Sequence, residues 1–249
     1  MAAGARVSRR HSGSRRIRRM RATLFTILAI AATMAEAARP MITDDARVVD
    51  PFACQLETWV KRNRDSTEYW ALPACNPLGL FELTIGGART WEHGTSGLTD
   101  VQLQAKTILR PLEPDNWGAG LAVGTLKHPR REVADGWPGD AYFYVPVSVA
   151  LNGDQWVLHF NAGAVHRRDE GANLATWGFG NEIRLRDDLF FIPEVFRNER
   201  GRPFYQVGFR YWLVKDRVQM DATVGNRLTS DTSERWFSIG MRLLTPPLK

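Results

Sequence analysis

The chain has 249 residues, of which 44% are hydrophobic and 24% charged, a composition that excludes intrinsic disorder and fits a single all-β domain. Its formal charge of +6 would favour nucleic-acid binding if the basic residues were spread over the fold. Residues 1–37, however, hold eight arginines and one acid, which leaves 25 basic and 26 acidic residues in the remainder. We therefore expect no nucleic-acid partner.

Residues 1–37 have the features of a signal peptide. An arginine-rich start precedes the apolar run 24–32, and Ala35-Glu36-Ala37 forms an A-x-A cleavage site. The nine-residue run is too short to cross a bilayer, which needs about 20 residues. We predict cleavage before Ala38, with translation starting at either Met1 or Met20, so that 38–249 is the mature domain.

The two cysteines, Cys54 and Cys75, lie in the exported part of the chain. In an oxidising compartment they predict one disulfide, nominally worth about 3 kcal/mol by loop-closure entropy. No CxxC and no clustered histidines accompany them, so the sequence indicates neither a metal site nor a cofactor.

The rest of the chain predicts strands of about ten residues, each followed by glycine, proline, asparagine or aspartate. No stretch after residue 40 shows a sustained helical period. We expect about twelve strands, at 54–62, 66–72, 80–91, 98–109, 117–128, 140–152, 155–168, 172–185, 189–197, 203–213, 218–226 and 234–244.

The connections between these strands roughly alternate in length. The longer loops are expected at 92–97, 129–139 and 198–202, and the shorter turns at 111–116, 152–154, 187–188 and 215–217. Such alternation is typical of the two ends of an outer-membrane barrel.

Alternation within the strands places an apolar face opposite a polar one. Val207 and Phe209 alternate with Gln206 and Arg210, and a soluble sandwich would satisfy this pattern too. The length of the strands and the charged, glycine-rich polar face favour a membrane barrel with a wet lumen. Aromatic residues near strand ends are expected to form interfacial girdles: Trp59, Trp70, Trp91, Trp117, Trp137, Tyr142, Trp156, Tyr211, Trp212 and Trp236.

These features predict an all-β fold, an antiparallel transmembrane β-barrel of about 12 strands in contact with outer-membrane lipid. The polar faces supply the candidate lumen-lining residues, which either line a narrow pore or form a closed network of ion pairs. They are Lys106, Arg110, His159, Arg167, Glu182, Arg184, Arg210, Asp221 and Arg242. Glu194 is ambiguous, because its face also carries Phe190, Ile192 and Phe196 and a bulge near Pro193 would change the register.

Catalytic motifs are absent from the sequence. His159 could transfer a proton or bind a metal, but a hydrogen-bonded histidine within a polar barrel explains it as well. An outer-membrane phospholipase would need a Ser–His–Asn set, and His159 is near Asn161 without a serine at a convincing strand spacing. We therefore predict that the protein is not an enzyme.

The segment 39–49, which reads RPMITDDARVV, and the following Cys54–Val60 stretch (54–60) resemble the start of the phenol-degradation MetA-like outer-membrane proteins. That group opens with a comparable RP…TDDA motif and an early strand containing glutamate. The resemblance implies an exported barrel with a role in transport.

The sequence thus predicts a porin-like channel or transporter for a small solute in the bacterial outer membrane. The alternatives are an occluded barrel with a structural or surface-interaction role and, with less support, a lipid hydrolase.

Overall fold

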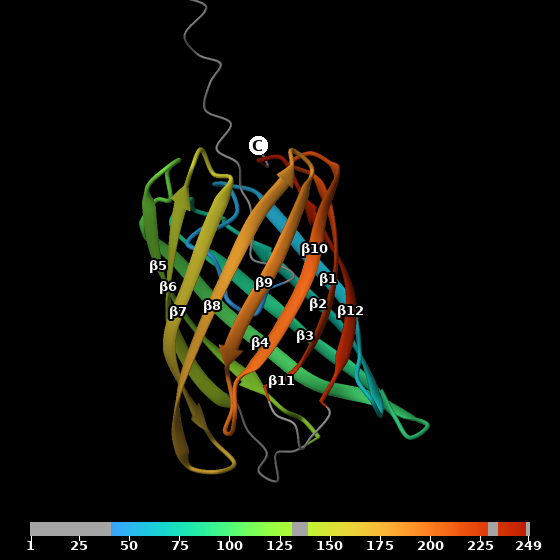
Figure 1. Cartoon of the computed structure of the whole chain (residues 1–249). Coiled ribbons are helices and arrows are strands. Elements are labelled where there is room, and N and C mark those ends of the chain that lie inside the picture. Colours follow the sequence, from blue (N-terminus) through green and yellow to red (C-terminus); the bar gives the residue numbers. More distant parts are fainter. Residues whose placement is uncertain (1–40, 131–138, 229–233, 248–249) are drawn as a thin grey trace, which may run out of the picture. The chain divides into compact units, whose positions relative to one another are not determined.

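The computed structural model describes residues 41–130, 139–228 and 234–247, so the expected signal peptide at 1–37 lies outside the described residues. The described chain forms a closed barrel in which all twelve neighbouring strand pairs are antiparallel (Figure 1). This confirms the predicted fold class. The strands are β1 (Cys54–Arg62), β2 (Ser66–Cys75), β3 (Glu82–Glu92), β4 (Thr95–Arg110), β5 (Trp117–Lys127), β6 (Asp140–Leu151), β7 (Trp156–Arg167), β8 (Ala172–Arg186), β9 (Leu189–Arg197), β10 (Phe204–Val214), β11 (Val218–Arg227) and β12 (Trp236–Leu244).

The connections separate into two ends, here called the short-turn end and the long-loop end. The short-turn end carries 76–81, 111–116, 152–155, 187–188 and 215–217, and the long-loop end carries the other six connections. The prediction of a long loop at 92–97 is wrong. There β3 and β4 continue to a two-residue turn, His93-Gly94, whose residues both have positive φ (49° and 83°), as a tight hairpin requires.

The polarity of the barrel is the reverse of that in a soluble protein. Large apolar side chains on the outer wall are exposed, for example Phe209 at 51% and Ile239 at 46%. Charged and polar side chains of the same strands, such as Arg210 and Ser238, are buried inside. An exposed apolar band of this extent calls for lipid as its solvent.

Five of the aromatic residues expected in interfacial girdles point into the barrel instead. Trp59, Trp70, Trp236 and Tyr142 line internal cavities, and Trp212 is 6% exposed within an internal apolar cluster. Trp91, Trp117, Trp156 and Tyr211 are exposed, as expected of a girdle, and Trp137 lies outside the described residues. Sequence position near a strand end does not reveal which face a residue occupies.

Cys54 and Cys75 form the predicted disulfide. The two residues are directly opposite each other in the β1–β2 register, with their Cα atoms 4.0 Å apart. Backbone hydrogen bonds continue the pairing past the bridge, from Asn76 N to Ala53 O and from Phe52 N to Asn76 O. The bridge therefore fixes the point where the chain enters the first strand. Across the described residues, no helix is long and apolar enough to cross a membrane.

An arginine on the outer wall should destabilise the barrel according to its depth in the bilayer. Ile239→Arg, near the middle of β12, should cost about 2–4 kcal/mol, and Leu213→Arg, near the end of β10, about 0–1 kcal/mol. Denaturant unfolding in lipid vesicles measures both. Equal costs at the two positions would contradict the assignment of the outer wall to the bilayer.

Removing the disulfide should destabilise the folded barrel without preventing strand pairing. The bridge spans 21 positions, and its loss in a Cys54→Ala/Cys75→Ala variant should cost about 3 kcal/mol. Denaturant unfolding of the double variant and the wild type in lipid vesicles measures this loss of stability. Mass spectrometry of the unreduced wild-type protein should find no free thiol, and two free thiols would refute the bridge.

Candidate functional site

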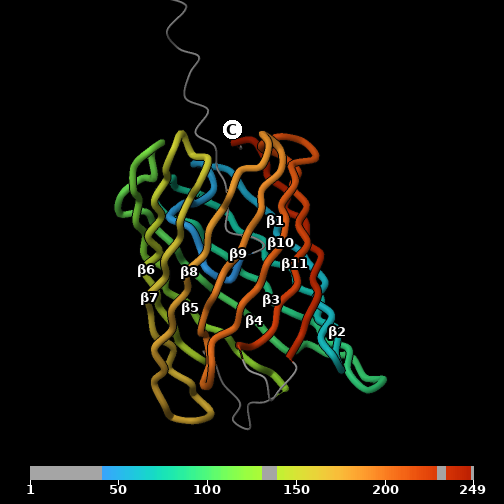
Figure 2. The backbone as a smooth tube through the Cα atoms, in the orientation of Figure 1, coloured from blue at the N-terminus to red at the C-terminus, as the bar shows by residue number. Residues whose placement is uncertain are grey.

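Residues 41–53, here called the plug segment, lie inside the barrel rather than beside it. Thr43, Asp45 and Ala46 are each 1% exposed and Val49 is 2% exposed. Figure 2 shows this stretch of chain, in blue, behind β8 and β9 and within the ring of strands. The plug segment leads directly into β1 at Cys54. The lumen is therefore partly filled by the protein's own N-terminal chain.

The wall formed by β6 to β9 holds the backbone of the plug segment. The Glu194 carboxylate accepts hydrogen bonds from Ile42 N and Thr43 N, both at 2.8 Å. Ser148 Oγ accepts one from Ala46 N at 2.8 Å. The Asn161 amide, oriented to satisfy both partners, bonds the backbone N–H and carbonyl of Asp44. Side chains of the barrel thus satisfy plug backbone groups that would otherwise be buried without partners.

The opposite wall holds the acidic side chains of the plug segment. Lys106 Nζ lies 2.7 Å from Asp44 Oδ2 and 3.4 Å from Asp45 Oδ1, and its side chain is 4% exposed. Glu82 accepts a hydrogen bond from Val49 N at 2.9 Å. The Lys106 contacts pair buried charges, and the Glu82 contact gives a buried carboxylate a backbone donor, as a surrounding of low polarity requires.

Glycines in β8 make room for this close approach. A Cβ added to Gly178 would overlap Thr43 Oγ1 and lie 3.1 Å from Thr43 Cβ. One added to Gly180 would lie 3.1 Å from Met41 Sδ. These two glycines therefore allow β8 to pack closely against the plug segment.

A small apolar cluster completes the docking. Met41 packs with Phe190, Ile192 and Trp212, all 6% exposed or less. This explains the apolar residues on the Glu194 face of β9. The β9–β10 register is continuous through Pro193, so no bulge is needed to bring Glu194 inside.

His159 lies in a buried row of polar contacts that runs from β6 to β10. Ser148 Oγ lies 2.8 Å from His159 Nδ1, His159 Nε2 lies 3.6 Å from Glu182 Oε1, and Arg210 Nη1 lies 2.6 Å from that same oxygen. The serine that the sequence did not place is opposite His159 on β6. Ser148 and His159 are 0% exposed, and Ser148 Oγ accepts a hydrogen bond from Ala46 N of the plug segment, so both side chains are covered while the plug segment is docked.

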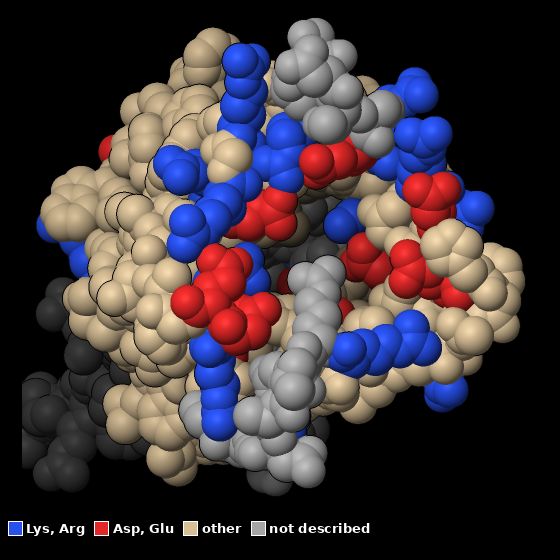
Figure 3. Space-filling model, turned by 90° about the horizontal axis from the view of Figure 1, so that it is seen from below, with Lys and Arg blue, Asp and Glu red and all other residues tan. Residues whose placement is uncertain are grey.

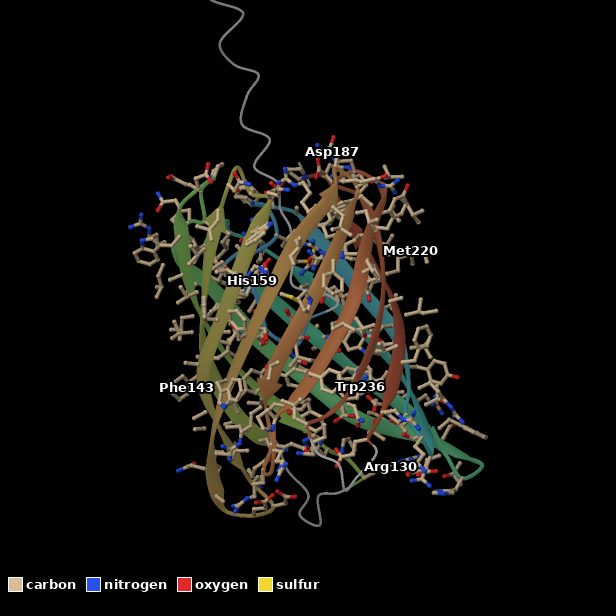
Figure 4. All side chains as sticks on the ribbon, in the orientation of Figure 1. Arg130, Phe143, His159, Asp187, Met220 and Trp236 are labelled. Atoms are coloured by element: carbon tan, nitrogen blue, oxygen red, sulfur yellow. A yellow bond between two sulfur atoms is a disulfide. The ribbon has the colours of Figure 1, made fainter. Side chains whose placement is uncertain are left out.

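The other predicted lumen residues occupy different levels of the barrel. Arg242 donates to Gln55 Oε1 at 2.7 Å and lies 3.9 Å from Glu57, Asp221 is opposite Arg210 in register, and Arg167 pairs with Asp140 at 3.0 Å. Arg184 is half-buried near the end of β8. Figure 4 shows His159 and Trp236 at different heights of the barrel, with Met220 and Phe143 at its outer sides.

Arg110 is a correction to the predicted lumen set. A bulge between Ile108 and Arg110 shifts the β4–β5 register, so the alternation that placed Arg110 inside fails at this point. Its guanidinium is exposed, lies 4.1 Å from the centre of the Trp117 ring and donates to Trp117 O.

Two sizeable cavities lie beside the plug segment, and a smaller one of about 160 Å³ also contacts Ile42. One, of about 420 Å³, lies against β1 to β4, and the other, of about 350 Å³, lies toward β6 to β8. Viewed from the long-loop end, the barrel is hollowed, and both basic and acidic side chains surround the hollow (Figure 3). The described residues contain no group of three or more histidine, cysteine or acidic side chains that could hold a metal ion.

Sequence reasoning missed the residues that define this site, namely the plug acids, Ser148, Glu82 and the role of Glu194. A signal was available in 39–53, which is not predicted as a strand although it holds apolar residues such as Met41 and Val49.

Comparisons with known proteins agree with the fold. A family model described as "Uncharacterised conserved protein UCP029691" matches residues 23–244. The solved structure of the KdgM porin is similar at a TM-score of 0.57 and 9% identity, covering 76% of this chain and 98% of that one. The NanC porin is similar at a TM-score of 0.55 and 11% identity, with the same coverage. No sequence among the curated proteins matches this chain.

Removing the Lys106 charge should release the plug segment. Lys106→Met leaves Asp44 and Asp45 without their cation, and breaking a buried pair in this way costs about 3–5 kcal/mol. Trypsin should then cut the folded protein after Arg47, which is protected in the wild type. Arg167→Met, which breaks the Asp140 pair away from the plug acids, is the matched control and should leave Arg47 protected. Persistent protection in Lys106→Met would contradict the docking scheme.

Proposed function

The chain belongs to the family described as uncharacterised conserved protein UCP029691, and we propose that it is a porin-like channel of the bacterial outer membrane, closed by its own plug segment. The observation that carries this proposal is a closed barrel with a polar lumen, which residues 41–53 fill in part and in which internal cavities remain. A small solute would cross when the plug segment moves.

The contacts of the plug segment suit reversible docking. Most are hydrogen bonds and ion pairs, and water can replace them once the lumen opens. The apolar cluster that holds Met41 contains only three other buried side chains. The covalent link at Cys54 to β2 would keep a displaced plug segment attached at the short-turn end.

An occluded barrel without transport is the second candidate. The buried Glu182–Arg210 pair and the Arg242 contacts favour this candidate. They place charged side chains, held by one another, along the inner face of the barrel, where they take up space in the lumen. These pairs lie on adjacent or nearby strands and do not cross the plug segment. They are therefore compatible with an open lumen when the plug segment leaves.

The remaining assignments follow from this proposal. The apolar outer wall would contact outer-membrane lipid, and the long-loop end would face the outside of the cell. The expected signal peptide, the resemblance to the MetA-like group and the absence of enzymatic activity stay predictions. One similar solved structure is titled as the KdgM porin in complex with disordered oligogalacturonate, which supports passage of a small solute here.

A reversible cross-link tests the gate. In Thr43→Cys/Gly178→Cys, the two Cβ positions lie about 3.1 Å apart, close enough for a disulfide after a small shift of the plug segment. In planar bilayers the oxidised variant should show no conductance above background, and reduction should restore openings of wild-type size. The wild type under the same reductant and the single Thr43→Cys variant are the controls.

Two outcomes would count against the proposal. Conductance that is unchanged by the cross-link would show that the plug segment does not close the path. If neither the wild type nor Lys106→Met conducts at any voltage, the occluded barrel is the better account.

A further inference from the structure

The larger cavity contains a pair of tryptophans that the barrel does not need as an interfacial girdle. Trp59 on β1 and Trp70 on β2 are paired across the strands, and their rings are parallel to within 2° with centroids 5.1 Å apart. Both line the 420 Å³ cavity. On the outer side of the pair, the strand neighbour of Trp70 is the small residue Ala88. A flat aromatic platform therefore stands in a polar, water-accessible lumen.

Polar groups that can form hydrogen bonds with ligand hydroxyls line the same cavity. Gln102 donates to Tyr142, whose hydroxyl donates to Gln104 Oε1. Within the described part of the chain, Gln102 Oε1 and Gln104 Nε2 have no hydrogen-bond partner. One acceptor and one donor are thus available on neighbouring inward positions of β4. Glu68 lies at the edge of the platform and accepts from the Trp70 indole N–H at 2.8 Å.

The charges that line this cavity exclude an anionic ligand. Among its lining residues, the three cations already have acidic neighbours: Lys106 near Asp44, Lys61 near Glu68 at 3.5 Å, and Arg47 near Asp45 at 3.9 Å. Glu57, Glu82 and Asp100 add further carboxylates to the lining. Each cation in the described lining therefore already has an acidic neighbour, which leaves a ligand carboxylate in competition with the protein's own carboxylates.

We propose that this cavity is a binding site for a short neutral saccharide. The C–H faces of a pyranose ring stack on indole, while its hydroxyls both donate and accept, as the two glutamines require. A flat apolar ligand would use the tryptophans but would leave the glutamines and carboxylates desolvated without partners. The cavity volume falls in the usual range for small-molecule sites, about 300–1,000 Å³. This inference rests on the proposed channel in one respect: it names the class of solute that would enter the lumen.

The test compares saccharides that differ only in charge. Isothermal titration of the full chain in detergent would use trigalacturonate, its fully methyl-esterified form, maltotriose and cellotriose. We expect at least one neutral trisaccharide to bind, and the methyl ester to bind at least tenfold more tightly than the free acid. Trp70→Ala should weaken the binding of the neutral ligand at least tenfold. Trp156→Ala, on the exposed outer surface, is the matched control and should leave it unchanged.

Three results would overturn the inference: no binding of any neutral saccharide, tighter binding of the free acid, or equal binding by wild type and Trp70→Ala. Near-wild-type β-sheet circular dichroism and the same heat-dependent gel shift in Trp70→Ala would show that the variant is folded. Failure of the inference is distinguishable from failure of the channel proposal. A protein whose conductance responds to the Thr43–Gly178 cross-link but which binds no neutral saccharide remains a gated channel.

Discussion

The rest of the structure depends on one constraint: lipid offers no hydrogen-bond partner, so every backbone N–H and C=O group in the bilayer must be paired within the protein. The twelve strands meet it by pairing every neighbour and closing β1 on β12. Lipid also disfavours charge on the outer face, so charged side chains at the level of the bilayer point inward. A dozen strands leave too much space for these side chains alone to fill. The plug segment occupies part of that space, and its backbone and acids complete the pairing of the inner wall.

Because the plug segment fills only part of the lumen, the two walls of the barrel contact it differently. The wall from β6 to β9 presents Ser148, Asn161 and Glu194 to plug backbone groups, and its glycines allow contact. The wall from β1 to β4 contacts the plug segment through Lys106 and Glu82 and otherwise leaves open space. Most hydrogen bonds to the plug backbone therefore come from one wall, whereas the larger of the two cavities lies against the other.

The sequence predicted those features of the fold that depend on residues close together along the chain. Strand positions and the faces of β10 to β12 follow from a period of two, and the Cys54–Cys75 bridge followed from composition and compartment. Features set by neighbours distant in sequence were beyond reach. Ser148 is opposite His159 only because of the β6–β7 register, and Arg110 leaves the lumen only because of a bulge. Trp59 and Trp70 were assigned to a lipid interface because proximity to a strand end does not distinguish the two faces.

One chain of hydrogen bonds connects the two walls. Tyr144 lies 2.7 Å from Asp44 Oδ2, the atom that Lys106 also holds, and 3.2 Å from Gln104 Oε1. Its hydroxyl has a single proton and can satisfy only one of these acceptors at a time. A ligand that bonds to Gln104 would change which of these two acceptors receives the Tyr144 proton. It would thereby change whether Asp44 keeps its hydrogen bond from Tyr144. The proposed saccharide site and the docking of the plug segment would thus be linked through the Tyr144 hydroxyl, which contacts both Asp44 and Gln104.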